Sequence, residues 1–344
     1  MIKHLPFFLS NDFKFVITIY SVSKLLVFIT GFFILGSDFF QIMGTKWDSY
    51  IYESIASHGY AGYYIVFSPV YPALIYILHI ILPTVFSAYI IVNIFGYIFV
   101  YIIYRYLGLK TALLISIFPV YVVFSTIPYS DDILLTFISL ALFINSSTIS
   151  SIFLSLSVLT FYNIIITIPA FIMKNWKIII MPILTGIGIF IAYFIFFGNP
   201  FIYFNIEKEY WNAGFTLPNV QAMFLLNGWF TSEPWKFLNF EIPRPLWLIR
   251  NYLFFIFYFL GDYFLLKSNL KNRKFLFLYS LLVEMPLLFI NGVPAISIPR
   301  LLLPAFPIFY GYASLRKNII YLYAIISIFL IPIITIWQMT AFFS

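Results

Sequence analysis

The residues best suited to chemistry gather in the segment that follows the first long apolar run. That segment reads Trp47-Asp48-Ser49-Tyr50-Ile51-Tyr52-Glu53-Ser54-Ile55-Ala56-Ser57-His58-Gly59-Tyr60. Its apolar residues recur every four positions, which predicts one face of a short amphipathic helix in the membrane interface, and Gly59 is expected to end that helix. Asp48 lies in the first turn, where the helix dipole favours a carboxylate. A carboxylate at a water–lipid boundary could act as a general base.

Other interpretations of the charged residues stay open. Asp48 could simply cap its helix, because acidic residues are common at helix N-termini. Asp131 and Asp132 begin another apolar run, and adjacent carboxylates point to different helix faces, so they do not form a glycosidase pair. One of them could orient a substrate, assist Asp48, bind a cation or cap the helix. Arg300 could donate bidentately to a phosphate or snorkel to the interface.

The chain that carries these residues has the composition of a membrane protein. Of its 344 residues, 63% are hydrophobic and 9% are charged, against roughly 25% charged in an average soluble domain. This excludes an ordinary soluble globular protein, a disordered chain and a nucleic-acid-binding domain. The apolar runs are continuous, unlike the alternating strands of a membrane β-barrel. We therefore expect an all-α, polytopic transmembrane protein.

The metal and redox chemistry open to the chain is restricted by its composition. It has no cysteine and three histidines, which excludes disulfides and thiolate metal sites and makes a histidine-rich metal site improbable. No dense acidic triad occurs in the sequence. We expect no metal and no cofactor.

A bilayer-spanning helix needs about 20 apolar residues. The longest apolar runs lie near 15–36, 85–104, 108–127, 178–198, 247–266, 275–290, 300–314 and 318–338. The segments 69–82 and 133–145 are short, and 149–173 could be one long helix or two half-helices that meet near Phe161–Asn163. No cleavage site follows the first run, which predicts an uncleaved span. We expect about 10 or 11 spans in a single domain over 1–344.

The basic residues predict an orientation. Of the 19 Lys and Arg residues, 12 precede the first run or flank four short connections, and short basic loops face the cytoplasm. The opposite loops are then 37–68, 128–132, 199–246 and 291–299, and they hold nine of the 12 acids. The number of crossings places all these basic loops on one side if 69–82 enters the membrane without crossing and 149–173 is a broken pair. Loops 37–68 and 199–246 are therefore expected on the non-cytoplasmic side.

Several motifs, in the same order along the chain, resemble the PIG-V family, which contains the second mannosyltransferase of GPI-anchor synthesis and its prokaryotic relatives. The resemblance covers about 14–314, with Asp131 where the family has Glu and Ser68 where it often has an aromatic or small residue. The matching pieces are Trp47-Asp48 with Tyr52, Ile55-Ala56 and Gly59-Tyr60; Phe67-Ser68-Pro69-Val70-Tyr71-Pro72; Pro128-Tyr129-Ser130-Asp131; and Arg300-Leu301-Leu302-Leu303-Pro304-Ala305-Phe306-Pro307.

The resemblance implies a GT-C glycosyltransferase. Such an enzyme takes mannose, or another hexose, from a polyprenyl (dolichyl) phosphate carrier and transfers it with inversion, without a metal, to a lipid-linked or glycolipid acceptor. Asp48 would be the base, Asp131 a second catalytic carboxylate and Arg300 the group that stabilises the leaving phosphate. The motif aromatics implied to bind substrate are Trp47, Tyr52, Tyr71 and Tyr129. The expected partners are donor, acceptor and membrane lipids, in a prokaryotic plasma membrane or a eukaryotic endoplasmic reticulum.

Two other functions remain open at this stage: a transporter or flippase of lipid-linked sugars, and an inactive scaffold subunit of a glycosylation complex. The loop aromatics Tyr210, Trp211, Trp229 and Trp235 could anchor the membrane interface or stack on sugar. Lys24 and Glu284 lie inside apolar runs, where ionisable residues are functional candidates. They could pair with each other or each reach a polar cavity.

Overall fold

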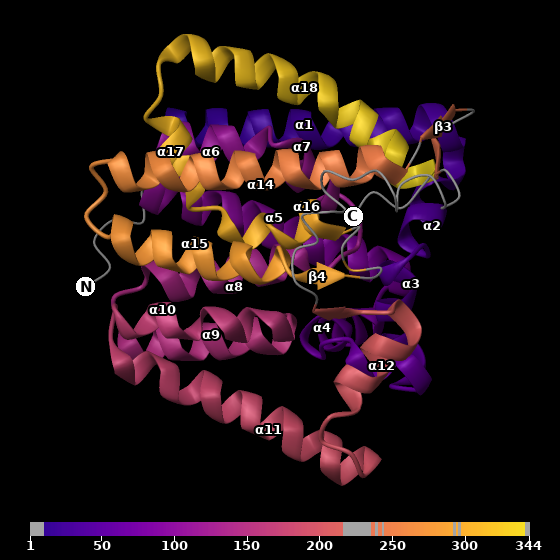
Figure 1. The fold of residues 1–344 in the computed structure, drawn as a ribbon. Helices are drawn as coiled ribbons and strands as arrows, with labels where there is room; N and C mark the ends of the chain where they lie inside the picture. The colour runs from indigo at the N-terminus through magenta and orange to yellow at the C-terminus, as the bar shows by residue number, and fades with distance from the viewer. Residues whose placement is uncertain are drawn as a thin grey trace.

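The computed structural model describes residues 10–215, 235–237, 240–242, 244–291, 294 and 297–340, and this part of the chain is a bundle of helices (Figure 1). The helices are α1 Asn11–Leu35, α2 Phe39–Gly44, α3 Asp48–His58, α4 Val70–His79, α5 Thr84–Leu107, α6 Leu109–Ser116, α7 Pro119–Phe124, α8 Asp131–Phe143, α9 Ser147–Thr160, α10 Ile168–Ile172, α11 Ile180–Phe197, α12 Ile202–Trp211, α14 Arg244–Lys267, α15 Arg273–Leu287, α16 Ile298–Leu301, α17 Ile308–Ala313 and α18 Lys317–Thr340.

Short 3-10 turns and strands connect these helices. The 3-10 turns are η2 Gly36–Asp38, η3 Gly62–Val66, η4 Tyr162–Thr167, η5 Trp176–Ile179 and η8 Leu303–Ala305. Strand β1 Gly214–Phe215 pairs antiparallel with β4 Ile290–Asn291, with Gly214 opposite Asn291. Strand β2 Trp235–Phe237 pairs with β3 Phe240–Ile242. The β1–β4 pair matters for the site because it joins the chain after α12 to the chain before α16.

Five segments in the described part of the chain are long and apolar enough to cross a membrane. They are Asn11–Gly44, Thr84–Leu107, Trp176–Phe197, Ile249–Lys267 and Lys317–Met339. The expectation of a helical protein with several membrane-spanning helices is confirmed at this level. A total of 10 or 11 spans stays a prediction.

Prolines break two of the runs that the sequence presented as full-length spans. The run 108–127 is divided into α6, which ends at Ser116, and α7, which begins at Pro119. The run 300–314 is divided into α16, η8 and α17, with Pro304 inside η8 and Pro307 just before α17. A proline removes one backbone donor and clashes with the preceding turn, so neither run forms one continuous helix. Helix α15, from the run 275–290, has 15 residues.

The segment 149–173 forms two short helical pieces and not one long helix, which is the alternative that keeps the basic loops on one side. Helix α9 ends at Thr160, and η4 and α10 then lead the chain back. Asn175 Nδ2 donates to Ser147 Oγ at 2.7 Å, and Lys174 Nζ donates to the Ile144 carbonyl at 2.6 Å. The two ends of the segment therefore lie together.

Helix α4 corresponds to the short segment 69–82. It has ten residues, so it is about 15 Å long, half the roughly 30 Å hydrocarbon core. It is therefore too short to cross by itself, which agrees with a segment that dips into the membrane.

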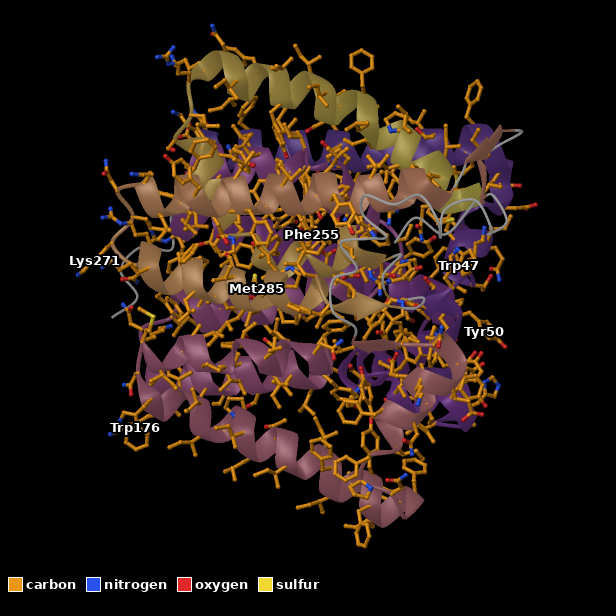
Figure 2. All side chains as sticks on the ribbon, in the orientation of Figure 1. Trp47, Tyr50, Trp176, Phe255, Lys271 and Met285 are labelled. Atoms are coloured by element: carbon orange, nitrogen blue, oxygen red, sulfur yellow. The ribbon has the colours of Figure 1, made fainter. Side chains whose placement is uncertain are left out.

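The predicted basic loops and the predicted catalytic loop lie at opposite ends of the molecule. Figure 2 shows Trp176 and Lys271, from two basic connections, at one end, and Trp47 and Tyr50 at the other. The long helices run between these ends, while α3, α4 and α12 gather at the second end (Figure 1). This arrangement is the one expected if the two ends face opposite sides of a membrane.

The buried ionisable residues Lys24 and Glu284 do not pair with each other, so this one of the two alternatives that the sequence left open is excluded. Lys24 Nζ donates to Tyr20 Oη at 3.2 Å and lies in the field of Asp132. Glu284 lies beside Asp262 of α14. The reason is the packing of their helices: α1 packs on α18 and α6, whereas α15 packs on α14 and α10.

Candidate functional site

Three charged residues that are far apart in the sequence meet at the end of the bundle that holds α3. Arg300 Nη1 donates to Asp48 Oδ2 at 2.7 Å, and Arg300 Nε lies 3.9 Å from Asp131 Oδ1. The side chains are only 11%, 21% and 16% exposed for Arg300, Asp48 and Asp131. The structure therefore brings together the charged residues of three separate motifs.

Local hydrogen bonds explain why the two aspartates lie near each other. Ser49 Oγ donates to the Pro128 carbonyl at 3.0 Å, and Tyr52 Oη shares a 2.9 Å hydrogen bond with Ser130 Oγ. These contacts fix α3 to the chain that enters α8. Each aspartate is the first residue of its helix, where the helix dipole stabilises a negative charge.

The backbone just before Asp48 is unusual. Trp47 has a φ of 54°, a conformation that bulky residues rarely adopt and that costs on the order of 1–3 kcal/mol. The chain turns at Trp47, and α3 begins at the next residue, Asp48. The N-cap position is occupied by Trp47 without a side-chain cap hydrogen bond, and the Asp48 side chain pairs with Arg300.

Aromatic side chains hold the guanidinium of Arg300 in place. Its Cζ lies 4.9 Å from the ring centre of Tyr129 and 5.8 Å from that of Phe124. Such cation–π contacts are strongest where water is excluded. Tyr129 is itself held by Gln338, whose Nε2 donates to Tyr129 Oη at 3.3 Å. The cation is thus positioned by α16, by the turn before α8 and by α18.

The charges of this cluster shift the protonation of its members. Burial opposes the charge on Arg300, but the carboxylates of Asp48 and Asp131 outweigh burial and raise the pKa of the guanidinium. Asp131 lies in the 128–132 segment, ahead of the apolar run of α8. Burial raises the pKa of Asp131 to about 6, Arg300 works against that rise, and Asp48 adds to it. Arg300 therefore stays charged, while Asp131 titrates close to neutrality.

A cavity of about 400 Å³ opens beside the ion pair. Its wall takes Asp48 and Tyr52 from α3 and Arg300 from α16, and the rest comes mainly from the motif around Phe67, from η4 and from α12. The volume is in the usual range for ligand pockets, roughly 300–1,000 Å³. The cavity can therefore hold a small polar group in contact with both members of the ion pair.

A second, more apolar cavity of about 310 Å³ continues from the first. The two share wall residues that include Tyr162, Tyr203 and Leu301, and the second is otherwise lined largely by aliphatic and aromatic side chains of η4, α11 and α15. The site thus consists of a charged chamber that opens into an apolar one. This shape suits a ligand with a polar head and an apolar tail.

The remaining motif aromatics take different positions. Tyr52 lines the first cavity. Tyr71 is 1% exposed, donates to the Ala88 carbonyl at 3.2 Å and packs against Tyr52 with ring centres 5.0 Å apart, so it supports Tyr52. Tyr129 lies under Arg300, as described above. Trp47 is 40% exposed and lies beside Lys46, outside the cavity wall.

Helix α12 adds a group that the motifs did not indicate. Glu207, Tyr203 and Trp211 line the first cavity. Burial raises the pKa of Glu207 to about 7; the nearby Tyr203 hydroxyl works against that rise, and the charge of Asp48 adds to it. The spacing of four between Tyr203, Glu207 and Trp211 places them on one helix face. That spacing is a signal in the sequence that could have identified this wall.

Part of the large loop 199–246 lies outside the described residues. This applies to residues 216–234, which include the predicted aromatic Trp229, and the side chains of 235–248 are also not described. Within the described ranges, no group of three or more His, Asp or Glu residues is placed to hold a metal ion. The basic residues in the described wall of the first cavity are Lys208 and Arg300.

Comparison of the chain with protein-family models, with curated proteins and with solved structures found no match.

Proposed function

We propose that this protein is a membrane glycosyltransferase that moves mannose from a polyprenyl-phosphate carrier to a lipid-linked or glycolipid acceptor on the non-cytoplasmic side. The observation that carries the proposal is the Asp48–Arg300 ion pair in the wall of a cavity that continues into an apolar chamber. A donor of this class has a sugar-phosphate head and a hydrocarbon tail, so its site needs a charged cavity for the head and an apolar chamber for the tail. The resemblance of the motifs to the PIG-V family adds to this support.

In the proposed reaction Asp48 is the general base. The acceptor hydroxyl oxygen attacks the anomeric carbon of the donor sugar and gives its proton to Asp48. The bond from the anomeric carbon to the phosphate oxygen breaks, and polyprenyl phosphate leaves with the bonding electrons. Attack opposite the leaving group inverts the anomeric carbon. The ion pair with Arg300, at 2.7 Å, holds the Asp48 carboxylate in position beside the cavity.

Arg300 is the proposed partner of the phosphate. Its Nη1 binds Asp48, its Nε is buried on the side of Asp131, and the side chain lines the first cavity. A guanidinium has five donor hydrogens in a fixed fork, so it can hold a carboxylate and a phosphate together. Negative charge grows on the leaving phosphate, and a preorganised cation lowers the energy of that state. Asp131, on the far edge of the guanidinium, holds Arg300 in position.

The proposal is tested by a transfer assay on the purified protein in nanodiscs. Radiolabelled farnesyl-phosphate-mannose is the donor and octyl α-mannoside is the acceptor probe. The expected result is a labelled disaccharide that forms with time. Arg300→Ala should weaken donor binding and slow transfer, and Lys110→Ala, in a connection at the opposite end of the chain's predicted topology, is the control.

Other outcomes would identify a different function. Movement of the intact labelled donor across a vesicle membrane, without disaccharide, would indicate a flippase. Donor binding without either activity would indicate a scaffold subunit. Neither outcome is compatible with the proposed role of Asp48.

A further inference from the structure

The wall of the first cavity that comes from α12 differs in character from the wall that carries Arg300. It presents the carboxyl of Glu207, the hydroxyl of Tyr203 and the ring of Trp211. Tyr203 Oη donates to Asn163 Oδ1 at 3.4 Å, which links α12 to η4. Arg300 makes ion pairs with Asp48 and Asp131. Glu207 is a member of neither pair, and Lys208 is the basic residue nearest to it in the sequence of this wall.

This chemistry excludes the phosphate as the partner of Glu207. An ionised carboxylate repels a phosphate but accepts hydrogen bonds from neutral hydroxyl groups. The amide of Asn163 can both donate and accept. Aromatic rings beside a few fixed polar groups are the usual make-up of a small-molecule site. A sugar ring, with several hydroxyls and an apolar face, fits this wall.

We propose that Glu207, with Tyr203 and Asn163, forms a subsite that binds the hydroxyl groups of a sugar, on a wall separate from the one that holds Arg300. This rests on the proposed function for the identity of the sugar, which is that of either the acceptor or the donor. Glu207 acts by binding, and Asp48 remains the group that accepts the proton.

The position of α12 is fixed well enough for such a role. Tyr63 of η3 packs against Tyr210 and Trp211, with ring centres 5.0 Å and 5.6 Å apart. The chain after α12 is held by the β1–β4 pair, whose second strand precedes the Arg300 segment. The two walls are therefore tied together, and a sugar bound at Glu207 stays within the chamber that Arg300 lines.

The subsite should also depend on pH near neutrality. Burial raises the pKa of Glu207 to about 7, so the ionised form, which accepts hydrogen bonds from hydroxyls, is lost as the pH falls below that value. The other titratable and charged groups around this cavity are Asp48, Tyr52, Tyr162, Tyr203, Lys208 and Arg300. Tyr63 and Tyr210 lie behind it. Asp131, beside Arg300, also has a pKa raised toward neutrality, to about 6, so the pH dependence assigned to Glu207 is the part that Glu207→Gln removes.

The test compares Glu207→Gln with Glu209→Gln, an exposed residue two positions along the same helix. The KM for octyl α-mannoside and, in a separate arm, for farnesyl-phosphate-mannose is measured from pH 5.5 to 8.5. We expect Glu207→Gln to raise one of the two KM values by about 10- to 100-fold at pH 8, the worth of a hydrogen bond to a charged group. It should also remove the pH dependence of that KM, with kcat changed by less than about threefold.

A rise in the KM for octyl α-mannoside would identify the sugar as that of the acceptor, and a rise in the KM for farnesyl-phosphate-mannose would identify it as that of the donor. Glu209→Gln should behave like the native protein, and Glu207→Asp, which keeps the charge, should retain the pH dependence with a smaller rise in KM. Unchanged KM values in Glu207→Gln would overturn the proposal. A fall in kcat with unchanged KM would also overturn it, because Glu207 would then act in the chemical step.

A direct binding measurement separates this inference from the proposed function. Quenching of tryptophan fluorescence by octyl α-mannoside, or by farnesyl-phosphate-mannose, does not require turnover. Binding that is pH-dependent in the native protein and lost in Glu207→Gln, without any transfer, would support the subsite and reject the glycosyltransferase. If transfer occurs and the native and Glu207→Gln proteins bind both sugars equally well, the glycosyltransferase is supported and the subsite is rejected.

Discussion

At the scale of single residues, the site depends on how one guanidinium is shared. Asp48 Oδ2 holds Arg300 Nη1 at 2.7 Å, and the second oxygen of Asp48 is not needed for that contact. Asp131 stands on the other edge of the same guanidinium. A buried charge without its partner is strongly destabilising, so the three residues depend on one another for both position and charge. Substitution of any one of them should therefore alter the position and the charge of the other two.

Glu53, in the same helix as Asp48, provides a prediction about pH and stability. It is 8% exposed, its Oε1 has no hydrogen-bond partner among the described residues, and burial raises its pKa to about 7. Because the folded pKa exceeds the ordinary value of 4.5, the contribution of Glu53 to the free energy of unfolding is most favourable below about pH 4.5. That contribution is lost as the pH rises to about 7. Glu53→Gln should therefore raise the melting temperature at pH 8 by several degrees and change it little at pH 4.5.

The measurement is thermal unfolding in detergent at the two pH values, with Glu209→Gln as an exposed control. An equal effect at both pH values would assign the change to packing or hydrogen bonding, and not to ionisation of Glu53.

Motif order in the sequence predicted Asp48, Asp131 and Arg300 as site residues because each has a residue type suited to the chemistry. Glu207 was counted only as one of the outer acids. Its place in the cavity depends on the fold of α12 against η3, a contact between distant parts of the chain that periodicity does not reveal. The environment of Lys24 was missed for a similar reason, since Asp132 lies over a hundred positions further along the chain.

At the scale of helices, close packing around Gly96 joins α1, α5 and α8. A Cβ atom at Gly96 would lie 2.5 Å from Tyr20 Oη and 2.8 Å from Asp132 Oδ2. Tyr20 and Asp132 belong to the buried polar cluster of Lys24, directly behind Asp131. The absence of a side chain at Gly96 therefore allows α5 to approach this cluster.

Gly96→Ala should destabilise the protein by about 1–3 kcal/mol, the usual cost of overpacking. Gly188→Ala in α11 is the matched control, because a Cβ there meets nothing within 4 Å, and it should be neutral or stabilise by up to about 1 kcal/mol. Both are measured by thermal unfolding in detergent. Equal stability of the two variants would contradict the close packing at Gly96.

The sequence predicted the helices themselves with mixed success. It predicted α3 with its end at Gly59, because a glycine marks a helix end directly. For 149–173 it left open one long helix or two half-helices, and the structure has the second. It treated 108–127 and 300–314 as continuous spans, because hydropathy averages over a window and does not register where a proline stands. The backbone constraint of Pro119, Pro304 and Pro307 overrode the hydropathy.

At the scale of the whole molecule, function requires two ends with different partners. The basic connections around Trp176 and Lys271 lie at one end, and the α3 helix lies at the other (Figure 2). The native chain has no cysteine, so single cysteines can report on each end without background. Ser57, in α3, and Asn272, in the connection from α14 to α15, are both exposed.

Ser57→Cys should react with an impermeant maleimide added outside intact cells, and Asn272→Cys should react only after permeabilisation. This follows from the cytoplasmic preference of short basic loops. The reverse pattern would contradict the orientation, and the proposed use of a donor on the non-cytoplasmic side would then fail with it.

The most direct test of the central claim is the effect of Asp48→Asn on transfer and on donor binding in the same preparation. Asparagine keeps the size of Asp48 and an oxygen that can accept a hydrogen bond from Arg300 Nη1, but it cannot accept the proton. Transfer should fall by roughly 10²- to 10⁴-fold, the usual worth of a positioned base, while donor binding changes only a few-fold. The exposed variant Asp38→Asn should transfer normally. Near-normal transfer by well-folded Asp48→Asn would contradict the account and make Asp131 the next candidate for the base.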